Sequence, residues 1–372
     1  MVDLINLVQT LTSPHPLDRY LELVRPTLTV RDMRAEITHV RRSAPGSVTL
    51  TLRPTRQWKG HVAGQYVQIG VVIDGVRHTR CYSPVNPEGG RDRTIQLTVK
   101  AHPDGLVSQY LYRHATPGMV VDLTPADGVF RLPEPRPQRV LLISGGSGIT
   151  PVLSMLRTLA AEDHPGEVVF LHYAKSPAVL PHRAELDAIA QRHSNFRIEL
   201  RYPHRAPDLA RVDPDAPWVD LNQPKNSGYF AYDELERVAP WFADAQTYVC
   251  GPQSLMDAVR TIYQAEQLED RLHTEEFTLS FAPADAADAQ GTVSFSASGV
   301  SAQNNGAPLL EQAESAGLSP EYGCRMGICF SCTAVRRSGC TRNLRTGETD
   351  SDPDQPIQLC ISAPVGDVEV DI

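Results

Sequence analysis

The chain has 372 residues, of which 41% are hydrophobic and 21% charged, so its length and composition predict two or three globular domains. It carries 35 basic and 44 acidic residues, a formal net charge of −9. This balance argues against nonspecific binding to nucleic acid or anionic lipid, because both need a basic surface. No stretch has the roughly 18 apolar residues of a membrane-spanning helix, and Met1–Thr12 lacks the features of a signal peptide. We expect a cytoplasmic, multidomain protein without an integral membrane segment.

The first part of the chain predicts an antiparallel β-barrel domain. Short apolar runs such as Val48–Leu52 and Ile95–Val99 alternate with turn residues, and one helix is expected at Ser108–His114. The proline-rich stretch Pro133–Pro137 predicts a stiff linker. We therefore place the barrel domain at residues 34–135.

Beyond this linker the pattern changes to alternating strands and helices. Strands are expected at Val140–Ile143, Val168–Tyr173, Phe196–Tyr202 and Thr247–Cys250, with helices near 152–161, 184–193, 232–238 and 254–266. This alternation predicts an α/β domain with a parallel sheet, at residues 136–281. The small, acidic stretch Ala282–Gln290 predicts a flexible linker. A third domain is expected at 291–372, and residues 1–33 are interpreted as an extension packed on the barrel.

Three closely spaced cysteines in the third domain indicate an iron–sulfur site. Cys324, Cys329 and Cys332 read C-x4-C-x2-C, and Cys360 follows at a distance. Three thiolates on one loop and a distant fourth form the plant-type [2Fe–2S] pattern. A structural zinc site is the alternative, but such sites usually have two C-x2-C pairs and only one short pair is present. Seven cysteines in an acidic chain fit cytosolic cluster usage better than a disulfide framework.

Cys340 is a second candidate for the fourth cluster ligand. It follows Arg336–Gly339, which we expect to form a hairpin-like turn, whereas Cys360 ends the apolar strand Pro356–Leu359. A regular strand holds a thiolate rigidly, so the sequence favours Cys360.

A flavin-binding pattern lies in the barrel domain at Arg80-Cys81-Tyr82-Ser83. An arginine can hold a flavin phosphate, an aromatic ring can stack on the isoalloxazine, and a serine hydroxyl can hydrogen-bond flavin N5. Val99-Lys100 ends the next long strand, and Gly105–Ser108 opens a helix whose free N–H groups suit a pyrophosphate. Without the neighbouring motifs, Gly105 would be interpreted as a turn residue and Ser108 as a helix cap.

A dinucleotide-binding pattern lies in the α/β domain. Gly145–Pro151 reads G-G-x-G-x-T-P between a strand and a helix, where glycines let the backbone approach a pyrophosphate. Cys250-Gly251-Pro252 ends another strand at the same edge, where the thiol either touches the nicotinamide ring or is a buried core thiol. Lys175 follows the second strand and no acidic residue stands at that strand's tip, which favours NADPH over NADH. Solvated surface charge is the alternative reading of Lys175.

These motifs, in this chain order, resemble the ferredoxin–NADP reductase superfamily, specifically reductases with a C-terminal plant-type ferredoxin domain. The resemblance covers residues 30–372 and is closest to reductase components of fatty-acid desaturases and oxygenases; His273-x-Glu275-x-Phe277 fits the end of the family's nicotinamide domain. It implies a β-grasp fold for the third domain. It also implies hydride transfer from NADPH or NADH to the flavin, then single electrons to the [2Fe–2S] cluster and to a redox protein acceptor.

The resemblance implies a catalytic role for Ser83 and Cys250. It implies cofactor binding by Arg80, Tyr82, Ser83, Val99, Lys100, Gly105, Val107, Ser108, Gly145, Gly146, Gly148, Thr150, Pro151, Lys175, Gly251, Pro252 and Phe277. It implies cluster ligation by Cys324, Cys329, Cys332 and Cys360. The flavin is expected to be FAD and the protein a monomer. The alternatives are an FMN-containing reductase of a Rieske aromatic-ring oxygenase, or a redox sensor or scaffold without a dedicated acceptor.

Overall fold

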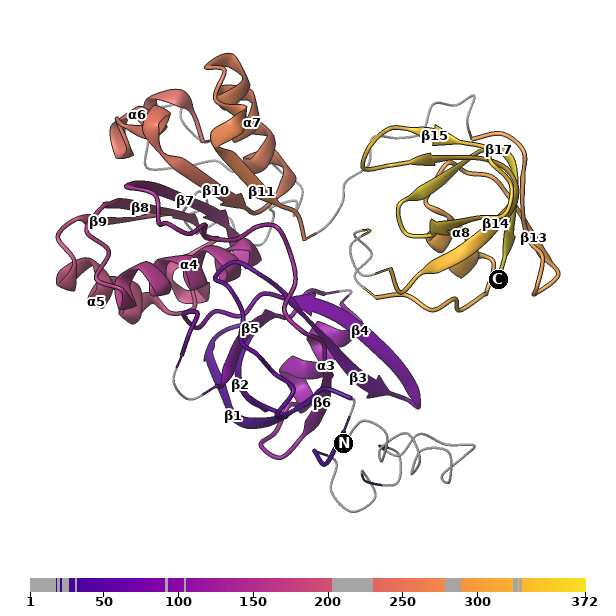
Figure 1. Cartoon of the computed structure of the whole chain (residues 1–372), viewed down its shortest axis with the longest axis horizontal. Helices are drawn as coiled ribbons and strands as arrows, with labels where there is room; N and C mark the ends of the chain where they lie inside the picture. The colour runs from indigo at the N-terminus through magenta and orange to yellow at the C-terminus, as the bar shows by residue number, and fades with distance from the viewer. Residues whose placement is uncertain are drawn as a thin grey trace. The chain divides into compact units, whose positions relative to one another are not determined.

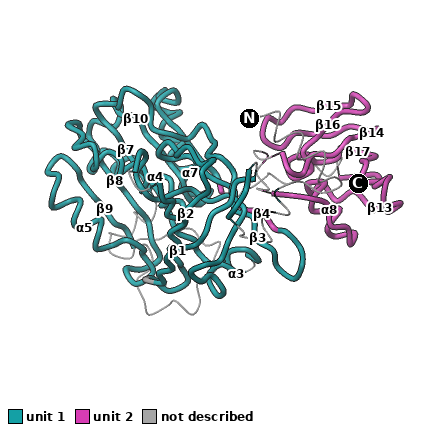
Figure 2. Tube along the Cα trace, turned by 60° about the horizontal axis from the view of Figure 1, so that its bottom comes forward, with its two compact units in different colours: residues 1–77, 81–276 teal, residues 78–80, 277–372 magenta. Residues whose placement is uncertain are grey.

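The computed structural model describes residues 18, 21, 27–30, 32–90, 93–103, 105–202, 230–277, 289–323, 327 and 330–372. The chain divides into two compact units, one of residues 1–77 and 81–276 and one of residues 78–80 and 277–372 (Figure 2). Most of the predicted extension 1–33, most of the predicted linker 282–290, and Cys324 and Cys329 lie outside the described residues. No helix in the described part of the chain is long and apolar enough to span a membrane.

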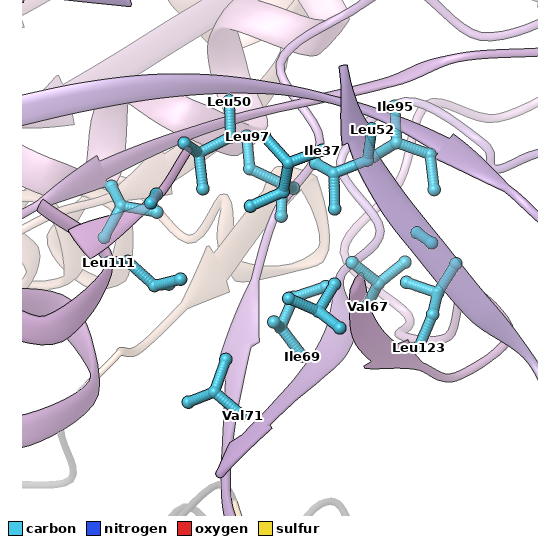
Figure 3. Packing of buried hydrophobic residues seen from close by; sticks show 14 of the residues in the cluster. Ile37, Leu50, Leu52, Val67, Ile69, Val71, Ile95, Leu97, Leu111 and Leu123 are labelled. Carbon is cyan, nitrogen blue, oxygen red and sulfur yellow. The ribbon is translucent and has the colours of Figure 1, made fainter. Parts of the chain in front are cut away.

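The first unit begins with a curved antiparallel sheet and one helix (Figure 1). Its elements are β1 (Arg34–Ala44), β2 (Ser47–Pro54), β3 (Val67–Ile73), β4 (Val76–Tyr82), β5 (Ile95–Lys100), α3 (Leu106–His114) and β6 (Val120–Leu123). The strand order is β4-β3-β6-β1-β2-β5, and an isolated bridge from Pro84 to Leu97 links the end of β4 to β5. Alternate residues of the strands, among them Ile37, Leu50 and Leu97, pack with Leu111 of α3 in one core (Figure 3). The predicted antiparallel sheet with its single helix is confirmed.

The rest of the first unit is a parallel sheet with helices. Its elements are β7 (Arg139–Gly145), α4 (Ile149–Ala161), β8 (Glu167–Tyr173), α5 (Arg183–Arg192), β9 (Phe196–Arg201), α6 (Tyr232–Val238), β10 (Gln246–Cys250), α7 (Gln253–Ala265) and β11 (Leu272–Glu275). The strand order is β11-β10-β7-β8-β9, with every pairing parallel, as the sequence predicts. After β9 the chain crosses from one side of β7 to the other. Such a reversal opens a crevice at the carboxyl ends of β7 and β10, where ligands bind in open α/β sheets.

A buried arginine joins the two halves of the first unit. Arg157 of α4 donates from Nη1 to the carbonyl oxygen of Val85 at 2.5 Å and from Nε to Glu185 at 2.8 Å. Its Nη2 lies 3.1 Å from Nδ1 of His182, whose Nε2 is 2.8 Å from the hydroxyl of Thr98 on β5. These contacts hold the barrel strands against α4 and α5.

The second unit is a mixed sheet with one helix. Its elements are β12 (Thr292–Phe295), β13 (Val300–Gln303), α8 (Leu309–Ser315), β14 (Thr333–Asn343), β15 (Thr349–Asp350), β16 (Gln355–Gln358) and β17 (Ser362–Asp371). The order is β13-β12-β17-β14-β15, with β16 pairing on β14, and β12 is parallel to β17. The core gathers Val293, Phe295, Leu309 and Val370.

The predicted hairpin-like turn at Arg336–Gly339 is wrong, because β14 continues through it as far as Asn343. The pairing with β17 shifts register between Arg336 and Ser338 and between Gly339 and Cys340. A Cβ on Gly339 would lie 2.2 Å from the carbonyl oxygen of Asp367. Glycine occurs here because the neighbouring strand comes close at a bulge, which the sequence does not distinguish from a turn.

Candidate active site

The predicted glycine loop and the predicted Cys250–Pro252 segment meet at the carboxyl ends of β7 and β10. A Cβ on Gly148 would lie 2.1 Å from the carbonyl oxygen of Cys250, and one on Gly145 would lie 2.6 Å from Cδ of Pro252. The two segments pack backbone against backbone, so no side chain fits between them. α4 begins at the end of this loop with Thr150 and Pro151 in its first turn, both buried. The free N–H groups of the helix therefore lie at the same edge.

A cavity of about 140 Å³ opens beside this loop and is lined by both halves of the first unit. Lys100 at the end of β5 and Lys175 after β8 line it together with Gly146. Nζ of Lys100 is 3.7 Å from the position of a Cβ on Gly146. Burial, and after it the charge of Lys175, lowers the pKa of Lys100. Among the described residues no carboxylate pairs with either lysine. Two unpaired cations beside a glycine turn suit an anionic phosphate.

His172 lines the same cavity and was not predicted from the sequence. Its ring is stacked with Phe170, with ring centroids 6.3 Å apart, and its Nδ1 lies 2.9 Å from Oγ of Ser144. Burial, and then the charge of Lys100, lowers the pKa of His172 to about 3, so the ring is neutral at pH 7. The sequence shows only a histidine inside an apolar strand, which indicates burial but no cavity.

Cys250 and Glu275 lie side by side at the ends of β10 and β11. Burial, then Glu275 and Glu276, raises the pKa of the Cys250 thiol well above its usual value, so the thiol stays protonated. Burial also raises the pKa of Glu275 to about 8, and its Oε2 has no hydrogen-bond partner among the described residues. Glu275 therefore carries a proton at neutral pH. In the sequence Glu275 belongs to the His273-x-Glu275-x-Phe277 pattern, but it is not predicted to be a site residue.

The predicted flavin residues lie at the end of β4: Arg80 and Tyr82 belong to this strand, and Ser83 follows it. The Ser83 side chain is 2% exposed, and its hydroxyl has no hydrogen-bond partner in the described part of the chain. Tyr82 is half-buried and packs against the barrel core, and Nη1 of Arg80 donates to the carbonyl oxygen of Thr79 at 2.8 Å. A buried hydroxyl without a partner is costly unless a ligand satisfies it. Ser83 thus fits the predicted bond to a flavin.

The predicted helix start at Gly105 is present. Of the residues predicted to bind a cofactor around it, Ser108 hydrogen-bonds its own loop and the two valines are buried in the core. Ser108 Oγ accepts from the N–H of His102 at 3.2 Å and donates to the carbonyl oxygen of Gly105 at 3.0 Å, so the hydroxyl braces its own loop. Val99 and Val107 are 1% exposed and belong to the barrel core. Both valine side chains are buried in this core, so these two residues could contact a cofactor only through their backbone. Thr150 lines the cavity beside the glycine loop. A Cβ on Gly251 would lie 2.8 Å from the backbone nitrogen of Gly145, so this glycine allows the close approach of the two segments. Phe277 has no feature here that distinguishes binding from packing.

Two of the four predicted cluster ligands are described, and the structure brings their segments together. Cys332 and Cys360 are 2% and 4% exposed. The N–H of Leu359 donates to the carbonyl oxygen of Cys332 at 3.0 Å. Gly327, with φ +69°, leaves no room for a Cβ, which would lie 2.6 Å from Cδ1 of Ile361. Gly327 therefore packs on the segment that carries Cys360.

Cys340 lies far from this pair. It is opposite Val365 on β17, whereas Thr333, next to Cys332, is opposite Gln358 on β16. At the usual strand rise the two positions on β14 are about 23 Å apart. The geometry favours Cys360 over Cys340.

Comparison with known proteins adds to this geometry. Residues 45–132 match the family described as "Oxidoreductase FAD-binding domain", and residues 142–261 match "Oxidoreductase NAD-binding domain". The chain is 35% identical to the NADPH oxidoreductase of Mycobacterium tuberculosis over 97% of its own length and 90% of that protein. It is 29% identical to the glycine betaine monooxygenase reductase subunit of Pseudomonas aeruginosa, over 83% and 86% of the two chains.

The solved structure of phthalate dioxygenase reductase has a similar fold. Its TM-score is 0.59 at 24% identity, over 91% of this chain and 97% of that one. The shared FAD-binding and NAD-binding domains, and the full-length relative in Mycobacterium tuberculosis, establish that this chain is an oxidoreductase of the ferredoxin reductase superfamily.

Proposed function

We propose that the chain is an NADPH-dependent reductase that passes electrons through FAD and a [2Fe–2S] cluster to an oxygenase or desaturase. The observation that carries the proposal is the meeting of the segments of Cys332 and Cys360 with Gly327, in a chain whose other unit has FAD- and NAD-binding domains. Two buried thiols supply half of the four cysteine ligands that a ferredoxin-type cluster needs, and Cys324 and Cys329 are proposed as the other two. A β-grasp ferredoxin domain at 291–372 accords with the mixed sheet and its helix.

When bound, FAD accepts a hydride and releases single electrons, and the cluster carries single electrons. The chain's own residues supply binding and orientation. Lys100 and Lys175 would hold phosphate groups of a bound dinucleotide, and the buried Ser83 hydroxyl would donate to the flavin. Glu275 keeps its proton on the carboxyl group at neutral pH, so it adds no negative charge beside Cys250.

Cofactor content tests this proposal. Protein purified without oxygen should contain one FAD and two irons per chain, and NADPH should produce the electron paramagnetic resonance signal of a reduced [2Fe–2S] cluster. The mass of the extracted flavin separates FAD from FMN. Flavin without iron, or iron that NADPH cannot reduce, would refute the electron path. The match of residues 45–132 to an FAD-binding family supports FAD.

Lys175 provides the test of cofactor choice. Lys175→Glu should lower kcat/KM for NADPH roughly ten- to a hundredfold, on the order of 1–3 kcal/mol, because a like charge would face the 2′-phosphate. The loss for NADH should be much smaller. Lys59→Glu, a matched change at an exposed lysine, should leave both values unchanged. Equal losses for the two cofactors would contradict the choice of NADPH.

The acceptor is proposed to be an oxygenase or desaturase because relatives are named as reductase subunits of glycine betaine monooxygenase and stachydrine N-demethylase. We also propose that the protein is a monomer, because one chain carries all the predicted binding motifs. Co-purification of the untagged protein from its own cells identifies the acceptor.

A further inference from the structure

Arg336 is a fully buried arginine in the second unit, and no sequence motif predicts a role for it. Its side chain has no exposed area, although its neighbours Arg337 and Ser338 on β14 are exposed. Burying a guanidinium costs several kcal/mol unless its N–H groups are paired. The hydrogen bonds that offset this cost show which part of the chain Arg336 holds in place.

The guanidinium of Arg336 binds one short stretch of chain between β15 and β16. Nη2 donates to the carbonyl oxygen of Asp352 at 2.6 Å and lies 3.1 Å from Oδ1 of Asp350. Nη1 donates to the carbonyl oxygen of Asp350 and, at 2.6 Å, to the hydroxyl of Thr341. Asp350 pairs with Thr341 on β14, and Gln355 pairs with Arg336 itself. Between these two pairs the backbone is not paired with β14. The guanidinium of Arg336 instead donates hydrogen bonds to the carbonyl oxygens of Asp350 and Asp352.

The segment that Arg336 holds leads directly to Cys360. β16 is short, Gln355–Gln358, and it pairs with β14 alone. Pro356 has no N–H to donate, so the ladder of β16 is weak. The far end of this strand is fixed by the bond from Leu359 to the carbonyl of Cys332. Its near end is fixed by Arg336.

The register of β16 decides where the Cys360 thiol lies. A slip of one residue turns every side chain of a strand to its other face. A metal ligand tolerates displacements of only about 0.2 Å. A weak strand therefore needs fixed ends if the residue after it is to ligate.

We propose that Arg336 is a positioning residue for Cys360, setting the register of β16 so that this thiolate meets the cluster. The inference rests on the proposed function, since it assumes that Cys360 is a cluster ligand. Arg336 acts through the chain path and does not itself touch the cluster.

The test compares full-length Arg336→Met, Arg336→Lys and Arg345→Met, purified without oxygen. Arg345 is the matched control: it is an exposed arginine of the same unit, in the turn between β14 and β15. Iron per flavin, the electron paramagnetic resonance spectrum after dithionite reduction, and far-ultraviolet circular dichroism are measured. Arg336→Met should lose at least half of its iron with its flavin content unchanged. Arg336→Lys, which reaches one carbonyl instead of two, should keep more iron but show shifted g values. Arg345→Met should match the wild type.

Three results would overturn parts of this scheme in distinguishable ways. Wild-type iron and g values in both Arg336 variants would refute the positioning role and leave the proposed function standing. Loss of folded structure in both variants, seen by circular dichroism, would show that Arg336 stabilises the whole unit instead of positioning one ligand. A wild-type protein without iron would refute the proposed function, and the positioning role with it.

Discussion

Gly148→Ala is expected to disturb the nucleotide site by steric overlap alone. Gly148 has φ −65° and ψ −3°, values that alanine adopts without strain. Its new methyl group would lie 2.1 Å from the carbonyl oxygen of Cys250 and 2.4 Å from the carbonyl carbon. Since nonbonded atoms settle near 3.5 Å, the glycine loop and the end of β10 must separate by about 1 Å or more.

The size of the effect follows from this overlap. Overpacking of a filled site costs about 1–3 kcal/mol, which for a domain of this size lowers the melting temperature by roughly 2–10 °C. A displacement of about 1 Å at the crevice should also lower kcat/KM for NADPH ten- to a hundredfold. Differential scanning calorimetry and initial rates with ferricyanide measure the two effects. Ser147→Ala, which removes an atom at the next position, should keep the wild-type melting temperature. A Gly148→Ala protein with wild-type melting temperature and kcat/KM would refute the packing argument.

Three further changes test other parts of the site. Lys100→Met should raise KM for NADPH several-fold with flavin content unchanged; loss of flavin with an unchanged KM would assign this lysine to the flavin instead. Cys360→Ser should abolish the cluster's visible and paramagnetic resonance spectra, whereas Cys340→Ser should leave both unchanged, and an iron-free Cys340→Ser protein would overturn the ligand assignment. Burial raises the pKa of Glu275 from its usual 4.5 to about 8, so the folded chain binds a proton that the unfolded chain releases. The free energy of unfolding should therefore fall as pH rises from about 5 to 8. Glu275→Gln should flatten that slope in urea titrations; identical slopes would show that Glu275 is not buried.

The strands and helices of the first unit were predictable because the pattern of apolar residues that indicates each one lies within a short stretch of sequence. Val140–Ile143 is apolar throughout and Val168–Tyr173 is apolar apart from His172, as is usual in buried parallel strands. The glycine loop was likewise predictable from its place between a strand and a helix.

The sequence did not show the features that depend on contacts between distant segments. The sequence predicts a turn at Gly339 because nothing in the neighbouring residues indicates that the backbone of Asp367 comes close to it. His172 and Arg336 look like ordinary strand residues, and only the fold shows which polar groups they meet. Lys100 was placed with the flavin because it ends a barrel strand, although its side chain reaches the loop of Gly146.

The contacts of Arg157 have a consequence for the cavity beside the glycine loop. Parting the barrel from α4 and α5 would break the hydrogen bond from Arg157 to Val85 and the one between His182 and Thr98. A hydrogen bond to a charged group contributes about 1.5–3 kcal/mol, so these bonds favour the closed arrangement of the two halves. Lys100 from the barrel and Lys175 from the parallel sheet line one cavity. Both lysines are therefore brought together when the chain folds, before any ligand arrives.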